Sequence, residues 1–167
     1  MNHIETEQCL AQMASELKAL IQQRGMQSPL MIGIHTGGVW VAEKLYEKLQ
    51  LSDPLGSLDI SFYRDDFTRI GLHPEVKPSN LPITVEDRHI ILVDDVLHTG
   101  RTIRAALNEI FDYGRPASIS LAVLVERDGR ELPIEANVVG QHVELSANQH
   151  IKLEGPERLQ LVVQEDE

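Results

Sequence analysis

The chain has 167 residues, of which 42% are hydrophobic and 25% are charged, as is typical of a single soluble globular domain spanning residues 1–167. Its net charge of −11 repels nucleic-acid backbones on average, so an RNA-binding role would require a local basic patch. The single cysteine, Cys9, excludes an internal disulfide and favours the reducing cytoplasm. We expect neither a signal peptide nor a membrane span, because no stretch is apolar for the roughly 18 residues that a span needs.

The first third of the sequence predicts a helix, a strand and a second helix. Apolar residues recur at helical spacing from Ile4 to Arg24, and Gly25 is placed to end that helix. The continuous apolar run Pro29–Ile34 is typical of a strand buried on both faces. His35–Gly38 breaks this run, and helical spacing returns over Val39–Leu49.

The next segment begins as a strand and then loses its pattern. Residues Ser57–Tyr63 alternate as in a strand, whereas no periodicity is found from Arg64 to Pro82. Loops of this length within a domain are often lids or binding loops. We therefore expect Arg64–Pro82 to form a lid or a binding loop.

Strands and helices alternate again in the second half. Buried strands are predicted at His89–Asp95 and Ile119–Val125, with a helix whose apolar face covers Ile103–Phe111 between them. Two short strands are predicted near the C-terminus, at Asn137–Gly140 and Leu159–Val163. This order predicts an α/β fold with a mostly parallel central sheet flanked by helices.

Two adjacent aspartates, Asp94 and Asp95, end the predicted strand HIILVDD. In open parallel sheets, ligands bind beyond the carboxyl ends of the strands, so we expect both carboxylates at that edge. Carboxylates cannot bind a phosphate directly. They suit hydroxyl groups, or a Mg²⁺ ion beside a phosphate.

The segment that follows the aspartates, VLHTGRT, leads into the next predicted helix. The first N–H groups of a helix form an anion site, most naturally for phosphate. Gly100 lets the backbone approach such a ligand, and Thr99 and Thr102 add hydroxyl donors. Together with the aspartates, this segment predicts a sugar phosphate as the ligand.

Each of these features also has a simpler interpretation, and one other class of protein shares part of the pattern. Aspartates at a strand end can simply cap the next helix, and Thr-Gly can simply form a turn. A nucleoside triphosphatase also has an apolar strand that ends in acidic residues. That class requires the motif G-x-x-x-x-G-K-[ST], and this chain contains no Gly-Lys pair.

Several motifs together resemble a known family. The stretch ILVDDVLHTGRT resembles the signature by which type I phosphoribosyltransferases bind phosphoribosyl pyrophosphate (PRPP). With DISFYRDDF and YGRPASISLAVLVERDGRELPIEANVVG, the chain resembles the PyrR family, pyrimidine operon attenuators that are also uracil phosphoribosyltransferases. The resemblance runs from about Met31 to the C-terminus and implies the type I phosphoribosyltransferase fold, with a small hood and a flexible flap.

The resemblance also implies roles for individual residues. The ribose hydroxyls and the 5′-phosphate of PRPP or UMP would be bound by Asp94, Asp95, Val96, Leu97, His98, Thr99, Gly100, Arg101 and Thr102. The pyrophosphate loop would be His35, Thr36, Gly37 and Gly38. The flap would carry Tyr63, Arg64, Asp65 and Asp66, with Arg64 contacting pyrophosphate. Uracil would be contacted through the backbone of Val138 and Val139.

The implied reaction joins uracil to PRPP and gives UMP and pyrophosphate, with Mg²⁺ carried by PRPP and not by a protein-only metal site. One alternative is a UMP-responsive regulator that binds pyrimidine leader mRNA with little catalysis. A remoter one is a phosphoribosyltransferase for another base. A dimer or tetramer is implied by the resemblance alone.

Two departures from the family pattern bear on these alternatives. Family members commonly have an arginine in the pyrophosphate loop, where this chain has the glycines of His35–Gly38. The C-terminal part is neutral or acidic, whereas many relatives are lysine-rich there. We therefore expect slower turnover and weak, salt-sensitive RNA binding, and we favour the enzyme.

Overall fold

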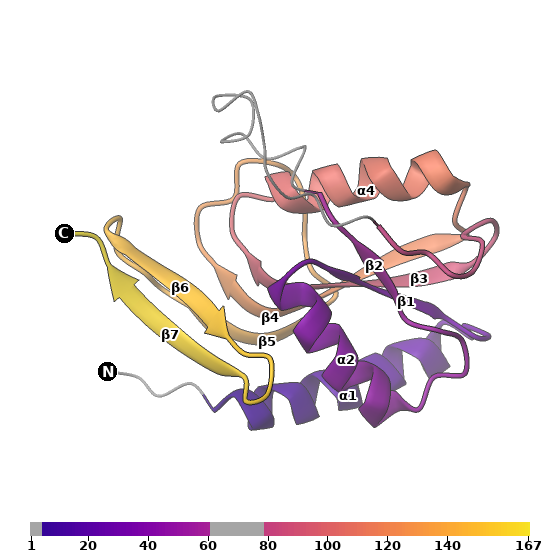
Figure 1. The fold of residues 1–167 in the computed structure, drawn as a ribbon, viewed down its shortest axis with the longest axis horizontal. Coiled ribbons are helices and arrows are strands. Elements are labelled where there is room, and N and C mark those ends of the chain that lie inside the picture. The colour runs from indigo at the N-terminus through magenta and orange to yellow at the C-terminus, as the bar shows by residue number, and fades with distance from the viewer. Residues whose placement is uncertain (1–4, 61–78) are drawn as a thin grey trace.

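A five-stranded sheet lies at the centre of the structure, with helices on both faces (Figure 1). The computed structural model describes residues 5–60 and 79–167. The strands lie in the order β2-β1-β3-β4-β5, and each neighbouring pair is parallel. Their bounds are β1 Leu30–Ile34, β2 Gly56–Leu58, β3 His89–Leu97, β4 Ser118–Arg127 and β5 Val138–Val143. The predicted α/β fold with a mostly parallel sheet is confirmed.

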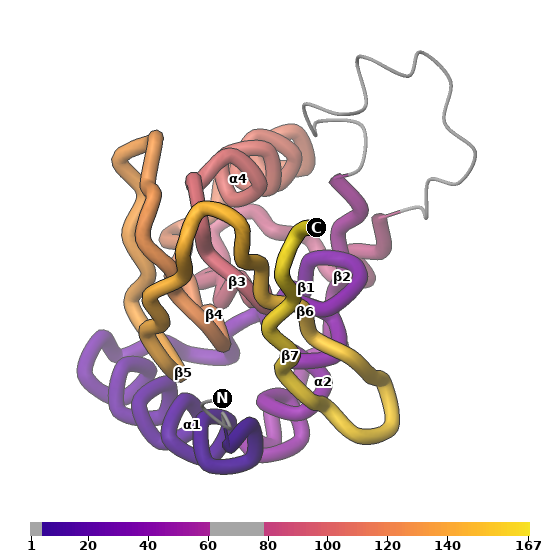
Figure 2. The backbone as a smooth tube through the Cα atoms, turned by 90° about the vertical axis from the view of Figure 1, so that its left-hand side faces the viewer, coloured from indigo at the N-terminus to yellow at the C-terminus, as the bar shows by residue number. Residues whose placement is uncertain are grey.

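Helices of the described residues cover both faces of this sheet. Their bounds are α1 Thr6–Gln23, α2 Gly37–Leu49 and α4 Arg101–Tyr113. Figures 1 and 2 show α1 and α2 on one face and α4 on the other. Helix α1 ends as predicted, because Gly25 adopts φ +59° and the N–H of Met26 donates to the carbonyl of Ile21 at 3.0 Å. None of these helices is long and apolar enough to cross a membrane.

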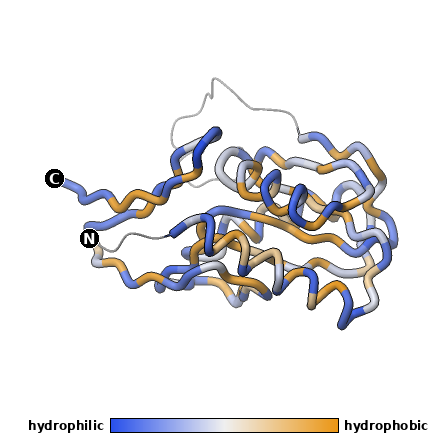
Figure 3. Tube along the Cα trace, turned by 90° about the horizontal axis from the view of Figure 1, so that it is seen from below, coloured by the Kyte–Doolittle hydropathy of each residue, from blue (hydrophilic) through white to orange (hydrophobic). Residues whose placement is uncertain are grey.

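The burial of β3 on both faces of the sheet explains why its sequence is continuously apolar. Ile90 and Leu92 join the hydrophobic cluster under α4, whereas Ile91 and Val93 join the cluster under α1 and α2. All four side chains are fully buried. Burial of each contributes about 1.5–3 kcal/mol. Figure 3 shows the same pattern, with hydrophobic residues following the central strands.

A C-terminal hairpin stands apart from the main sheet. Strands β6 (Gln149–Glu154) and β7 (Gln160–Glu165) pair antiparallel, and Figure 2 shows them beside the central sheet. Ile151 and Leu153 of β6 are buried in the cluster that also contains α1 and α2. The guanidinium of Arg127 at the end of β4 donates to the carbonyl of Gln149 at 3.3 Å. This hairpin is the element that can serve as the implied hood.

Three predictions about the elements need correction. The sequence predicted β7 but missed β6. The strand predicted over Ser57–Tyr63 covers only Gly56–Leu58 in the described residues, and the flap residues Tyr63, Arg64, Asp65 and Asp66 lie outside them. Strand β3 does not end at the aspartates. It continues because Val96 and Leu97 still pair, with Val125 and Glu126 of β4.

Candidate functional site

The two aspartates near the end of β3 have different environments. Asp94 is buried, with 5% of its surface exposed, whereas Asp95 is half-buried. The Oδ1 atom of Asp94 accepts a hydrogen bond from the N–H of Asp95 at 2.8 Å, and Oδ1 of Asp95 accepts one from Val96 at 2.8 Å. We expected both carboxylates on the open edge of the sheet. Asp94 departs from that expectation because the first turn of α2 lies against it.

The loop His35–Gly38 lies directly against this acidic pair. A Cβ atom built on Gly37 would lie 2.2 Å from Oδ2 of Asp95. A Cβ atom on Gly38 would lie 3.0 Å from Oδ1 of Asp94. The first distance is too short for a side chain unless Asp95 moves, and a Cβ atom on Gly38 would also lie 2.8 Å from the carbonyl oxygen of Val93, so both positions favour glycine. Two motifs that are far apart in the sequence therefore form one site.

Helix α2 begins within this loop, at Gly37. The first N–H groups of a helix have no partner inside it, and the helix dipole adds partial positive charge there. His35 is half-buried, its N–H donates to the carbonyl of Leu58 at 2.9 Å, and its peptide bond to Thr36 is cis. The loop thus presents backbone donors beside two carboxylates, as a site for an anion with a bound cation requires.

A hollow of about 170 Å³ lies at the start of α4, next along the chain from the aspartates. It is lined by Val96, Leu97, His98, Thr99, Gly100, Thr102 and Ile103. Gly100 caps the helix with φ +94°, a conformation that favours glycine. The Oγ1 atom of Thr99 accepts a hydrogen bond from the N–H of Arg101 at 3.2 Å. The predicted phosphate-binding residues His98, Thr99, Gly100 and Thr102 therefore line one hollow, whereas Arg101 does not line it.

His98 is the titratable side chain of this hollow. Desolvation by partial burial, and then the guanidinium of Arg127, lower the pKa of His98 below its ordinary value of 6.5, while Glu131 opposes this effect. These effects favour the neutral form of His98, which can donate one hydrogen bond. A Cβ atom on Gly129 would lie 2.8 Å from Nε2 of His98, so the segment after β4 packs against the imidazole.

That segment is a part of the site that the sequence did not reveal. Residues 128–137, between β4 and β5, contact the predicted phosphate loop, residues 97–101, through Gly129, Arg130 and Glu131. The sequence around Arg130 contributed to the family resemblance, but nothing in its spacing indicated contact with His98.

Val138 and Val139, the predicted base-binding residues, are the first two residues of β5. Val139 is level with Asp94, because both pair with Val123 of the strand between them. Two strand spacings separate them, which is roughly 10 Å. The side chain of Val138 is committed to the core, with 3% of the residue exposed. Val138 can therefore offer only backbone atoms to a ligand.

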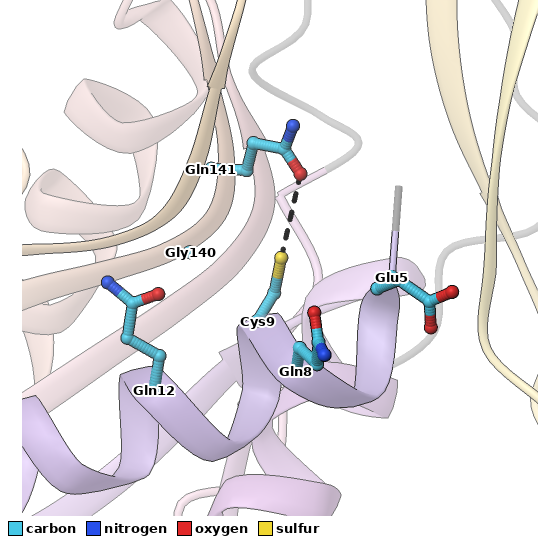
Figure 4. A pocket seen from close by; sticks show the side chains of 6 residues that line it. All are labelled: Glu5, Gln8, Cys9, Gln12, Gly140 and Gln141. Carbon is cyan, nitrogen blue, oxygen red and sulfur yellow. Dashed lines mark hydrogen bonds between the residues drawn. The ribbon is translucent and has the colours of Figure 1, made fainter. Parts of the chain in front are cut away.

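A second, larger hollow of about 370 Å³ lies between α1 and β5 (Figure 4). It is lined by Glu5, Gln8, Cys9, Gln12, Gly140 and Gln141. Cys9 is 7% exposed, its Sγ atom lies 3.7 Å from Oε1 of Gln141, and burial raises the pKa of its thiol. These properties agree with the predicted structural role of the cysteine. Neither the two aspartates nor the residues at the start of α4 line this second hollow.

The described part of the chain, residues 5–60 and 79–167, offers no metal site formed by the protein alone. In these ranges, no cluster of three or more His, Cys, Asp or Glu side chains could hold a metal ion. Asp94 and Asp95 nevertheless supply the oxygen ligands that Mg²⁺ prefers, beside a loop that can bind an anion. These residues fit a Mg²⁺ ion that shares its coordination with a phosphorylated ligand.

Comparison with known proteins gives a consistent result. Residues 5–157 match the phosphoribosyl transferase domain family. The chain is 64% identical over 154 residues to the "Bifunctional protein PyrR" of Nitrosococcus oceani, covering 91% of this chain and 87% of that protein. It is 56% identical over 156 residues to the protein of the same name from Pseudomonas fluorescens, covering 93% of each.

Solved structures with the same fold are more distant in sequence. The hypoxanthine phosphoribosyltransferase of Trypanosoma cruzi superposes with a TM-score of 0.70 at 19% identity, covering 97% of this chain and 94% of that one. A hypoxanthine phosphoribosyltransferase from Staphylococcus aureus gives a TM-score of 0.65 at 21% identity, covering 86% and 77%. At these identities the likeness concerns the fold alone.

Proposed function

The chain belongs to the PyrR family of phosphoribosyltransferases, and we propose that it is a uracil phosphoribosyltransferase that makes UMP and pyrophosphate from uracil and PRPP. The observation that carries this proposal is the packing of Gly37 against Asp95, with the phosphate hollow next along the chain from Asp95. This arrangement provides carboxylates for hydroxyls, a backbone loop for pyrophosphate and a cavity for the 5′-phosphate. PRPP has these three groups at matching positions around its ribose ring.

Each part of the site has one task in this proposal. Asp94 and Asp95 accept hydrogen bonds from the ribose 2′- and 3′-hydroxyls. The 5′-phosphate binds the backbone and hydroxyl donors of the hollow at the start of α4. Pyrophosphate binds the first turn of α2, whose N–H groups replace the arginine that relatives commonly have in this loop. The backbone of Val138 and Val139 contacts uracil.

The reaction breaks the bond between C1′ and the pyrophosphate oxygen and forms a bond between C1′ and N1 of uracil. The N1 proton of uracil passes to the departing pyrophosphate. Charge develops on the ribose as in glycoside hydrolysis, so no covalent nucleophile is needed. The protein orients the two reactants, stabilises the departing pyrophosphate and excludes water. Asp94 and Asp95 would hold a Mg²⁺ ion carried by PRPP, which would supply positive charge for the departing pyrophosphate.

A second function, UMP-responsive binding of pyrimidine leader RNA, is favoured by one feature of α4. Arg101, Arg104, Asn108 and Phe111 are all exposed and recur at helical spacing along one side of this helix. Single-stranded RNA is commonly recognised by stacking of its bases on aromatic rings and guanidinium planes. Phe111 is 57% exposed, an unusual position for a large aromatic side chain on a surface that does not bind a partner.

The experiment that tests the first function is UMP formation from PRPP, Mg²⁺ and a panel of free bases. RNA binding is tested separately, with substitutions of Arg104 and Phe111, which belong to the α4 surface but do not line the hollow at the start of α4.

A further inference from the structure

The connection between β4 and β5 lies against the phosphate loop. This β4–β5 loop comprises residues 128–137, and the phosphate loop comprises residues 97–101. The backbone N–H groups of Glu131 and Leu132 donate to the carbonyl of Thr99 at 2.9 and 3.1 Å. Two donors on one carbonyl fix the orientation of that peptide group.

Arg130 fixes the neighbouring peptide group. Its Nη1 atom donates to the carbonyl of His98 at 2.5 Å, and its Nε atom donates to the carbonyl of Ile134 at 2.8 Å. Its Nη2 atom makes a short ion pair with the carboxylate of Glu126. The guanidinium thus joins β4, the β4–β5 loop and the phosphate loop. Its side chain is 25% exposed, so these contacts are partly screened from water.

The orientation of these carbonyls determines where the adjacent N–H groups point. In a trans peptide the C=O of one residue and the N–H of the next point in opposite directions. The carbonyls of His98 and Thr99 face the β4–β5 loop, so the N–H groups of Thr99 and Gly100 face away from it. Both residues line the 170 Å³ hollow, and within the described part of the chain neither N–H has a protein acceptor.

We propose that Arg130 is a positioning residue for PRPP, which holds the Thr99 and Gly100 amides toward the 5′-phosphate without touching the ligand. The inference rests on the proposed phosphoribosyltransferase function. Its physical basis is that three nitrogen atoms of the guanidinium already donate to protein acceptors. A planar fork can hold a carbonyl and a carboxylate in fixed relative positions, whereas an ammonium is a point charge on a flexible chain.

The test compares Arg130→Met and Arg130→Lys with the wild-type chain. Isothermal titration with PRPP and Mg²⁺ should show a Kd about tenfold higher for both variants, because charge-assisted hydrogen bonds that set the loop geometry are lost. In steady-state assays the KM for PRPP should rise, while kcat and the KM for uracil stay within about twofold. Binding to the 5′-phosphate is remote from the reacting C1′ atom, so its loss should not slow the chemical step.

Arg88→Met is the matched control. Arg88 also donates to a backbone carbonyl, that of Ser28 at 2.5 Å, and forms a short ion pair with Asp53. These contacts lie at the amino end of the sheet, before β3 begins. The control therefore removes the same kind of contacts away from the phosphate loop, and its Kd for PRPP should match that of the wild type.

Each alternative outcome decides between explanations. If Arg130→Lys binds PRPP with wild-type affinity, the proposal is overturned, because positive charge alone would then suffice. This variant also decides the question if Arg130→Met fails to fold. Equal loss of affinity in Arg130→Met and Arg88→Met would overturn it in favour of general destabilisation. If the Arg130 variants lose PRPP affinity and the wild-type chain does not convert uracil, the inference is supported and uracil is contradicted as the substrate. A wild-type chain that binds no PRPP would overturn both.

Discussion

Gly37 and Asp95 occupy adjoining space, so closely that a Cβ atom on Gly37 would lie 2.2 Å from the Oδ2 atom of Asp95. The loop proposed for pyrophosphate and the carboxylate proposed for the ribose are therefore mechanically coupled. A change in one must move the other, because a packed site has no spare volume to absorb it.

Gly37→Ala should lower PRPP affinity about tenfold, because the new methyl group displaces the carboxylate of Asp95. Such crowding also costs roughly 1–3 kcal/mol in unfolding free energy. Isothermal titration measures the first effect and urea denaturation the second.

The coupling itself is tested by a double-mutant cycle with Asp95→Ala. Removing the carboxylate vacates the space that the new methyl group needs, so Gly37→Ala should cost much less stability in that background. Strictly additive unfolding free energies would show that the two residues do not interact.

Asp95→Asn and Asp94→Asn should differ in their effects. Each should weaken PRPP and UMP binding by about 1.5–3 kcal/mol through loss of a charge-assisted hydrogen bond. Asp94→Asn should also lower the melting temperature, because Asp94 is buried against the first turn of α2 and an amide would place an N–H₂ donor where the carboxylate has only acceptors. Calorimetric titration measures the effect on ligand binding, and thermal melts measure the effect on stability. Unchanged UMP affinity in the folded Asp95→Asn variant would remove this residue from the site.

His98 should titrate below its ordinary pKa of 6.5 in the ligand-free protein, because desolvation and then Arg127 disfavour its charged form. The unfolded chain then binds this proton more tightly than the folded one, so His98 lowers stability as pH falls from about 6.5 through its folded pKa. Saturation with PRPP should raise the pKa of His98, because the hollow proposed for the 5′-phosphate is lined by this residue. An NMR titration of the imidazole resonances measures both values, and a ligand-independent pKa would place the phosphate elsewhere.

RNA binding should be weak and steeply reduced by salt, because the net charge is −11 and the proposed surface on α4 has few cations. Phe111→Ala should weaken it further by removing a stacking surface, about 1–3 kcal/mol if one base stacks there, while PRPP affinity stays unchanged. Filter binding of the chain's own pyrimidine leader transcript, with and without UMP, measures this. A complex indifferent to UMP would contradict the regulatory function, and one indifferent to Phe111→Ala would place the RNA on another surface.

The order of strands and helices could be predicted because each buried strand is a continuous apolar run and each helix has an apolar stripe. Strand β6 was missed although Ile151 and Leu153 alternate with polar residues, because these are its only apolar residues, whereas β7 contains the continuous apolar run Leu161–Val163. The burial of Asp94 could not be predicted, since it depends on where the first turn of α2 packs.

Contacts between the loops of the site could not be predicted from the sequence. The aspartates and the phosphate loop are adjacent in sequence and were recognised from one motif. Arg130 and His98 are 32 residues apart, and their contact depends on the path of the β4–β5 loop. Local patterns report the elements that a segment forms, whereas contacts between loops are set by the packing of the whole sheet.

The most direct test of the central claim is a product assay with the full chain, PRPP, Mg²⁺ and uracil, cytosine, hypoxanthine, guanine or adenine in parallel. The proposed function predicts that uracil is consumed, that UMP and pyrophosphate appear in equal amounts, and that Asp95→Asn strongly reduces this activity. Preferential conversion of another base would contradict uracil as the substrate. Absence of any nucleotide product, from a folded wild-type chain that binds PRPP, would contradict the enzymatic function itself.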